Sequence, residues 1–183
     1  MRTSGLLLSC CGAALVLLSS CRQPAPDGRF ISYRLHPQQQ LLQLFYQDEQ
    51  GRRFGSIKHL GNWLAQRHQT LLFATNGGMY SPGGAPKGLF IQGQKLVTPL
   101  DTASGPGNFY LKPNGVFYLT TSRRAGICST EQFLASPRIG YATQSGPLLV
   151  FGGQLNPAFA KGSTNAVVRS GVGLLPDLSL IHI

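Results

Sequence analysis

Acidic residues are scarce in this chain of 183 residues, which has six Asp and Glu against sixteen Lys and Arg. So few acids exclude an EF-hand, a metal cage of several carboxylates and an acidic solvated tail. The net charge of +10 favours an anionic partner, such as a phosphate-bearing glycan, a lipid head group or nucleic acid. Because the basic residues are scattered rather than clustered, no nucleic-acid partner is expected.

Cysteine is also rare, and three of the four cysteines lie within the first 21 positions. Residues 1–20 combine one early positive charge with a short apolar run, which is typical of a secretory signal peptide and too short to span a membrane. The ending Leu18-Ser19-Ser20-Cys21 resembles the lipobox of bacterial lipoproteins, in which the cysteine is lipidated. We therefore expect Cys21 to carry a lipid anchor; an ordinary signal peptide with a chance cysteine is the alternative.

The residues that follow Cys21 predict the location of the protein in the cell. Residues 21–29 are proline-rich and aperiodic, which indicates a tether to a single domain over residues 30–183. Arg22 favours the outer membrane if the cell is Gram-negative, by resemblance to known sorting patterns. The expected location is the bacterial cell envelope, facing the periplasm. Cys128 would then be the one free thiol, so the core must hold the domain without a disulfide.

Long periodic helices are absent, and residues 30–183 read mostly as short apolar runs between glycines and prolines. One helix is predicted to follow Ser56 as N-cap, with Ile57, Leu60, Trp63 and Leu64 packing in the core, and a second over 129–134. Strands are predicted at 30–35, 41–46, 70–75, 148–151, 166–175 and 178–183, with a hairpin of 109–112 and 116–120 around Asn114-Gly115. The expected class is α+β: one domain with a mixed, largely antiparallel sheet and a few helices.

Two polar, glycine-containing segments are candidate binding loops, because glycine lets the backbone pass close to a ligand. They are residues 75–80 and 143–147. By themselves such loops are more often ordinary turns. Other familiar site motifs are absent from the sequence. It has no G-x-S-x-G elbow and no complete phosphate-binding P-loop, and its histidines lack the spacing of metal ligands.

Six segments occur in one order: FATNGGMY (73–80), PKGL (86–89), SGPGNF (104–109), KPNGVF (112–117), ATQSGPLL (142–149) and RSGVG (169–173). Together they closely resemble the bacterial branch of the phosphodiester glycosidase family, relatives of N-acetylglucosamine-1-phosphodiester alpha-N-acetylglucosaminidase, the uncovering enzyme. The resemblance spans Leu71 to Gly173. It implies a hydrolase that cleaves sugar-1-phosphodiester linkages, with a phosphate-linked glycan of envelope or exopolysaccharide metabolism as its substrate.

The implied chemistry suits an acid-poor, base-rich domain. A departing phosphate ester leaves without being protonated, so an activated water, a stabilised oxocarbenium-like sugar and cations for the phosphate matter more than a general acid. The candidate catalytic residues are Asn76, Asp101, Gln144 and Arg169. The candidate substrate-binding residues are Gly77, Gly78, Tyr80, Lys87, Asn108, Ser145 and Gly146.

Roles follow from side-chain chemistry. Asp101, the acid adjoining the third segment, is the candidate base, and capping a loop is its alternative role. Lys87 and Arg169 would contact the phosphate, Arg169 through its bidentate fork; a solvated surface charge is the alternative for each. Asn76, Gln144 and Arg169 are expected to meet in one pocket. No cofactor or metal ligand is predicted, with a divalent metal kept as an alternative.

The C-terminal end departs from the family pattern. Members continue past the strand with Arg169 to an Asp-Gly loop, and no such loop follows Gly173; Asp177 follows Pro176 in a turn. We therefore expect the domain to be incomplete at its C-terminus. A non-catalytic glycan-binding lipoprotein of the same fold is the alternative to an enzyme.

Overall fold

The structure is a computed structural model, and it describes residues 31–159, 168–177 and 179–182. The predicted signal peptide, Cys21 and the tether lie outside these residues, as do parts of the strands predicted at 166–175 and 178–183. All described residues belong to one compact unit. No helix among them is both long enough and apolar enough to cross a membrane.

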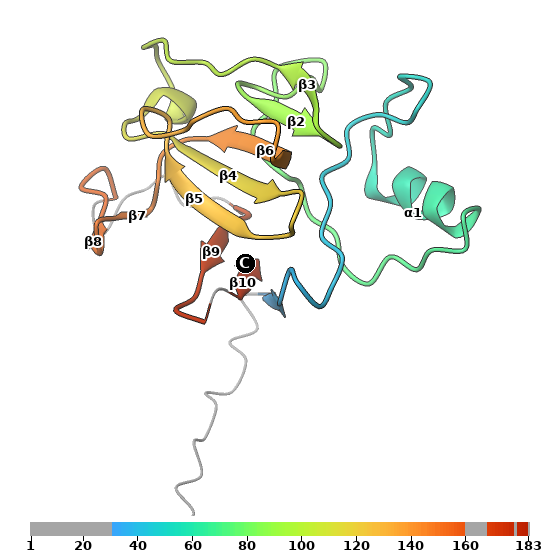
Figure 1. Cartoon of the computed structure of the whole chain (residues 1–183). Coiled ribbons are helices and arrows are strands. Elements are labelled where there is room, and N and C mark those ends of the chain that lie inside the picture. The colour runs from blue at the N-terminus through green and yellow to red at the C-terminus, as the bar shows by residue number, and fades with distance from the viewer. Residues whose placement is uncertain (1–30, 160–167, 178, 183) are drawn as a thin grey trace, which may run out of the picture. The chain divides into compact units, whose positions relative to one another are not determined.

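The described residues are rich in strands (Figure 1). The elements are β1 Tyr33–Leu35, α1 Ile57–Ala65, β2 Phe90–Gln92, β3 Lys95–Thr98, the 3₁₀ helix η1 Asn108–Tyr110, β4 Gly115–Thr120, β5 Ala125–Ser129, β6 Ile139–Ser145, β7 Val150–Phe151, β8 Gln154–Leu155, β9 Val172–Leu174 and β10 Leu180–His182. Every strand pairing among them is antiparallel. The largely antiparallel sheet is thus confirmed, and the fold is richer in strands than predicted, with one α-helix in the described part.

The main sheet has five strands in the order β3-β2-β6-β4-β5. Its strand β4 pairs with β5 on one side and β6 on the other. Successive side chains of a strand point to opposite faces, so Val116 and Phe117 enter two different hydrophobic clusters. Both faces of the sheet therefore carry core.

A second sheet, of order β1-β10-β9, covers one of these faces. Leu35 of β1 and Leu180 of β10 pack with Phe117 and Leu119 of β4, and all four side chains are buried. The turn at Pro176 and Asp177 connects the antiparallel strands β9 and β10, which confirms the predicted last pair of strands. Gly152 and Gly153, both at positive φ, form the turn between β7 and β8, and of the strand predicted at 148–151 only Val150–Phe151 forms.

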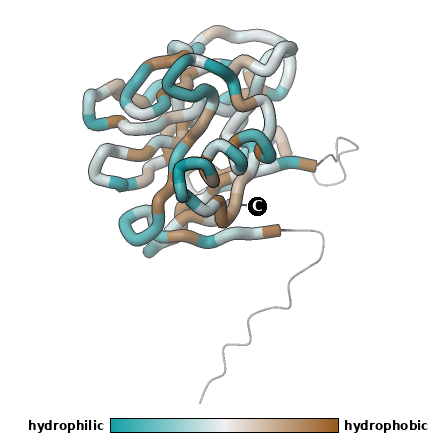
Figure 2. Tube along the Cα trace, turned by 90° about the vertical axis from the view of Figure 1, so that its right-hand side faces the viewer, coloured by the Kyte–Doolittle hydropathy of each residue, from teal (hydrophilic) through white to brown (hydrophobic). Residues whose placement is uncertain are grey.

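Helix α1 begins where the sequence predicted. The Ser56 side chain accepts a hydrogen bond from the His59 amide at 3.1 Å, which satisfies one free N–H of the first turn. Figure 2 is turned toward this side of the molecule, where hydrophilic and hydrophobic positions alternate along the chain. Leu64 is buried as expected, but the core position of Ile57 is wrong, because its side chain is 49% exposed in the first turn.

Two predicted strands are loops. Residues 41–46 pair with no other strand of the described part. The Gln92 side chain instead accepts a hydrogen bond from the Tyr46 amide at 2.8 Å, where a strand would bond to its neighbour. Residues 70–75 are neither a strand nor buried, since Leu72 is 74% exposed. Phe73 is held there by stacking on Tyr33, with ring centroids 4.9 Å apart.

Two further local predictions are wrong. No hairpin forms around Asn114, because Asn108–Tyr110 is a 3₁₀ helix and the Asn114 side chain donates to the Phe109 carbonyl; β4 pairs with β5 instead. No helix forms over 129–134. The Gln132 side chain does accept from the Ser129 amide at 3.3 Å, but the chain makes a single turn and leaves Leu134 82% exposed.

Candidate functional site

Gln144 lies fully buried in β6, at the centre of the predicted site residues. Its Oε1 accepts from the amides of Leu89, at 2.9 Å, and Asp101, at 3.0 Å. Its Nε2 donates to the Asp101 carbonyl at 2.6 Å. One primary amide thus bonds both backbone polar groups of Asp101 and fixes the segment that carries this carboxylate.

Asp101 is half-buried, and both oxygens of its carboxylate have partners. Oδ1 accepts from the Ala103 amide at 2.9 Å, and Oδ2 accepts from the Tyr110 hydroxyl at 3.2 Å. The bond to Ala103 is the loop-capping arrangement expected as its alternative role. Burial, followed by the negative charge of Asp101, raises the pKa of Tyr110, so this phenol stays protonated and keeps donating.

Lys87 lies against the ring of the same tyrosine. Its Nζ is 4.6 Å from the centroid of the Tyr110 ring and 4.9 Å from that of Phe109, which is cation–π distance. It makes no ion pair with any residue that the structure describes. Lys87, Asp101, Tyr110 and Gln144 form what we call the Asp101 cluster: a cation and a carboxylate linked through one phenol.

The two predicted binding loops lie beside this cluster, and their glycines serve close packing. The Lys87 amide donates to the Met79 carbonyl at 2.9 Å, which joins residues 75–80 to the segment 86–89. A Cβ on Gly78 would lie 2.5 Å from the Thr143 hydroxyl, and one on Gly146 would collide with the Phe109 carbonyl. Gly77 has more room, with a side chain of Leu44 at 3.5 Å from its position.

Asn76 and the segment with Arg169 meet at the surface. The Ser170 hydroxyl donates to Asn76 Oδ1 at 2.7 Å, so residues 94 positions apart are neighbours. Arg169 itself is exposed and precedes β9, so of the strand predicted at 166–175 only Val172–Leu174 forms among the described residues. Val168 is fully exposed and anchors nothing, and Val167 is outside the described residues.

The structure therefore brings the three predicted pocket residues together only in part. Asn76 contacts the neighbour of Arg169 on the surface, whereas Gln144 lies beneath and holds Asp101. Among the other candidates, Tyr80 is 66% exposed, Asn108 begins the 3₁₀ helix, and Ser145 ends β6. No three His, Cys, Asp or Glu side chains within the described ranges gather as metal ligands.

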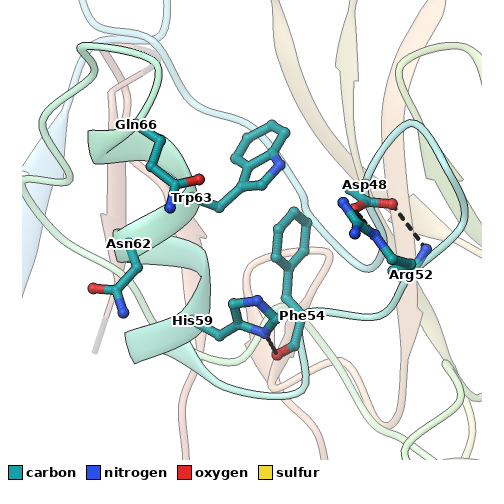
Figure 3. Close-up of a pocket in the computed structure, with 7 residues that line it drawn as sticks. All are labelled: Asp48, Arg52, Phe54, His59, Asn62, Trp63 and Gln66. Carbon is teal, nitrogen blue, oxygen red and sulfur yellow. Dashed lines mark hydrogen bonds and ion pairs between the residues drawn. The ribbon is translucent and has the colours of Figure 1, made fainter.

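Sequence reasoning missed a groove beside α1, of about 250 Å³ (Figure 3). The helix contributes His59, Asn62, Trp63 and Gln66, and the preceding turn contributes Asp48, Arg52 and Phe54. The four helix positions follow the spacing i, i+3, i+4, i+7 of one helix face. That polar and aromatic face was the signal in the sequence, but the prediction of core packing rests on the apolar positions of the helix alone, Trp63 among them. A second, more apolar hollow of about 300 Å³ lies near Leu41, Leu119 and Tyr141.

Comparison with known proteins places most of the chain in one family. A family model described as phosphodiester glycosidase matches residues 69–183. The chain is 32% identical over 159 residues to the uncharacterized protein YigE of Escherichia coli (strain K12), an alignment that covers 87% of this chain and 62% of that protein. The chain thus spans less than two thirds of the length of this relative. No solved structure matches the chain.

Proposed function

Because the chain belongs to the phosphodiester glycosidase family, we propose that it hydrolyses the bond between a sugar and a phosphodiester. The observation that carries the proposal is the Asp101 cluster, which lies inside the matched residues 69–183. The carboxylate of Asp101 bonds to the hydroxyl of Tyr110, and the cation of Lys87 lies against the ring of the same residue. These are the charges that the reaction needs: one for the incoming water and one for the departing phosphate.

Asp101 is the best base among the acids of the matched region. That region contains three acids, Asp101, Glu131 and Asp177. Asp177 pairs with Arg34, and Glu131 lies exposed in the turn after β5. Asp101 alone of the three is placed by a buried side chain from another strand, Gln144. We assign Gln144 as a positioning residue, because it acts on Asp101 rather than on the sugar.

Lys87 is the proposed phosphate contact. A lysine that is paired with a carboxylate attracts a phosphate only weakly. Lys87 contacts two aromatic rings and pairs with no acid among the described residues, so its positive charge is available to a ligand. Arg169 and Asn76 are proposed to approach the substrate from the surface segment joined by Ser170. Arg169 would add a second cation, and Asn76 would bond sugar hydroxyls.

In the proposed reaction the oxygen of water forms a bond to the anomeric carbon. The bond from that carbon to the phosphate oxygen breaks, and its electron pair leaves with the phosphate monoester of the second alcohol. Asp101 takes the proton of the water. The products are a free sugar and a phosphate monoester, and no sugar 1-phosphate forms.

Hydrolysis in ¹⁸O-labelled water tests this proposal. With the methyl diester of N-acetylglucosamine 1-phosphate as substrate, we expect ¹⁸O in the released sugar and none in methyl phosphate. Label in a phosphate product, or release of N-acetylglucosamine 1-phosphate, would show cleavage at phosphorus and overturn it. Asp101→Asn should abolish release, while Glu131→Gln, an exposed acid of the same region, should not. Binding of the diester without any product would instead support the glycan-binding alternative.

The envelope location forms part of the proposal. The lipobox-like ending at Cys21 and the excess of basic residues support a domain anchored by lipid near phosphate-linked envelope glycans. Labelling cells with a fatty acid should mark the chain, and Cys21→Ser should remove the label and release the domain from the membrane fraction. An unlabelled wild-type chain would contradict the anchor.

A further inference from the structure

We infer that the groove beside α1 is a binding site for a neutral sugar unit, separate from the Asp101 cluster. The groove lies over residues 48–66, ahead of the matched family residues 69–183. The inference therefore goes beyond the proposed hydrolysis and holds whether or not the Asp101 cluster turns over a substrate. Four observations carry it: an indole without a partner, a histidine with an assigned tautomer, paired charges and an aromatic wall.

The indole of Trp63 is the first observation. Its Nε1 is buried, yet it donates to no residue in the described part of the chain. Figure 3 shows this nitrogen on the edge of the ring that faces the Asp48–Arg52 turn across the groove. Buried donors nearly always have a partner. Protein atoms cover this donor, so it would pair with an acceptor of a bound molecule once a neighbouring side chain moves aside.

His59 supplies the opposite chemistry. Its Nδ1 lies 3.0 Å from the carbonyl oxygen of Phe54, and a carbonyl oxygen can only accept. Nδ1 therefore carries the proton of the neutral ring, which leaves Nε2 as an acceptor. Asn62 and Gln66, one turn apart on the same helix face, each add an amide that donates and accepts. A sugar hydroxyl both donates and accepts, so it matches this set.

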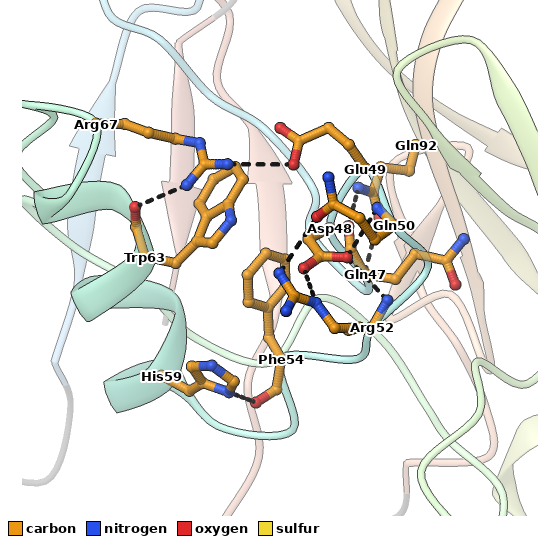
Figure 4. Close-up of polar contacts among 10 residues, drawn as sticks. All are labelled: Gln47, Asp48, Glu49, Gln50, Arg52, Phe54, His59, Trp63, Arg67 and Gln92. Carbon is orange, nitrogen blue, oxygen red and sulfur yellow. Dashed lines mark hydrogen bonds and ion pairs between the residues drawn. The ribbon is translucent and has the colours of Figure 1, made fainter.

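The charges around the groove cancel in pairs (Figure 4). Arg52 donates to Asp48 at 2.7 Å, and Arg67 lies 3.3 Å from Glu49. Burial raises the pKa of Asp48, but hydrogen bonds from Arg52 and Gln50 outweigh it and hold that pKa below its ordinary value, so the pair stays charged at neutral pH. Among the residues that line the groove, Asp48 and Arg52 are the acid and the base, and they pair with each other, so the lining carries no net formal charge and favours a neutral ligand.

Aromatic rings complete the site. Phe54 and Trp63 meet edge to face with centroids 5.1 Å apart, and Arg67 stacks over the Trp63 ring at 3.7 Å. Phe54 is buried and Arg67 covers one face of Trp63, so the apolar C–H face of a sugar ring would pack against the uncovered part of the Trp63 ring, while its hydroxyls reach the polar atoms beside it. A groove of about 250 Å³ suits one sugar unit rather than an extended chain.

Trp63 is the single tryptophan of the chain, so its fluorescence reports on this groove alone. We expect a saturable change when the whole chain is titrated with N-acetylglucosamine or glucose, and none with inorganic phosphate. Gln66→Ala and Asn62→Ala should each weaken the binding by about 2- to 10-fold, the loss of one hydrogen bond. Lys58→Ala, on the same helix but outside the groove, is the matched control and should leave it unchanged.

Two outcomes would overturn the inference. One is the absence of any saturable change with either sugar while circular dichroism shows a folded protein. The other is a response to phosphate equal to that with sugar. Asp101→Asn separates this site from the proposed active site: the fluorescence titration should be unaffected in that variant, even where hydrolysis is lost.

Discussion

The side-chain amide of Gln144 bonds both backbone polar groups of Asp101: its Oε1 accepts from the Asp101 N–H at 3.0 Å, and its Nε2 donates to the Asp101 carbonyl at 2.6 Å. The same Oε1 also accepts from the Leu89 amide. Replacing Gln144 by a residue of similar size without polar atoms therefore leaves three backbone groups without this partner. The relationship predicts both a stability effect and an activity effect.

Gln144→Met should lower the free energy of unfolding by about 3 kcal/mol, since each buried unsatisfied polar group costs about 1–3 kcal/mol. Urea unfolding followed by circular dichroism measures this loss. Gln94→Met is the control, because the exposed Gln94 makes one side-chain bond, to the Pro137 carbonyl at 3.1 Å; we expect less than about 1 kcal/mol there. If Gln144 positions Asp101, the folded variant should also lose kcat with little change in KM. Equal free energies of unfolding in the two variants would contradict a stabilising role for the hydrogen bonds of Gln144.

Lys87→Gln should reduce kcat/KM for a sugar phosphodiester by about 10- to 150-fold, the equivalent of roughly 1.5–3 kcal/mol for a charge-assisted contact. The free energy of unfolding should fall by only about 1–2 kcal/mol, because the variant loses two cation–π contacts but no ion pair among the described residues. Lys95→Gln, an exposed lysine of β3, removes the same charge elsewhere and is the control. Equal losses in both variants would point to net charge rather than to a phosphate contact.

Gly88→Ala should destabilise the domain more than Gly84→Ala. Both glycines have positive φ, +74° and +79°, so alanine at either site costs about 1–2 kcal/mol of backbone strain. Only at Gly88 would the new Cβ collide with the Gln144 amide and the Phe109 ring, whereas nothing lies within 4 Å at Gly84. This overpacking adds about 1–3 kcal/mol. Parallel urea unfolding of both variants measures the difference, and equal losses would contradict it.

Local signals in the sequence predicted those parts of the fold that local interactions hold. Ser56 caps α1 through a bond to an amide three residues away, and the turn at Pro176 and Asp177 joins two strands that are neighbours in the sequence. The strands predicted at 41–46 and 70–75 failed because their apolar runs do not reveal which partner will bond them. The Tyr46 amide is satisfied by Gln92, 46 residues further along the chain.

The candidate site shows the same division. Ordered motifs placed Asp101, Lys87 and Gln144 in one family pattern, and the structure brings them to one cluster. The role of Gln144 could not be predicted, since its partners lie 43 and 55 positions away and the bonds exist only after β6 pairs with β2. Arg169 was misplaced in a strand because its valine neighbours have high strand propensity, yet Val168 finds no packing partner and is fully exposed.

Asp177 gives the domain a defined sensitivity to acid. Its carboxylate accepts from the Ser179 hydroxyl at 2.6 Å and from the Ser179 amide at 3.1 Å, and it also pairs with Arg34. The hydrogen bonds from Ser179, followed by Arg34, lower the pKa of Asp177 to about 2. A carboxyl whose pKa is lower in the folded protein than in the unfolded chain stabilises the fold above the unfolded value, about 3.9.

That contribution should therefore be complete above about pH 5 and should disappear as the pH falls from about 4 toward 2. Asp177→Asn should flatten the fall of the unfolding free energy over this window, measured by urea unfolding at successive pH values. Ser179→Ala should flatten it more than Arg34→Gln, because the hydrogen bonds from Ser179 are the larger cause of the lowered pKa and the ion pair with Arg34 is half exposed to solvent. An unchanged slope in Asp177→Asn would show that other carboxylates govern the acid response. A larger effect of Arg34→Gln than of Ser179→Ala would show that the charge of Arg34, rather than the hydrogen bonds, stabilises the ionised carboxylate that joins β1 to the β9–β10 turn.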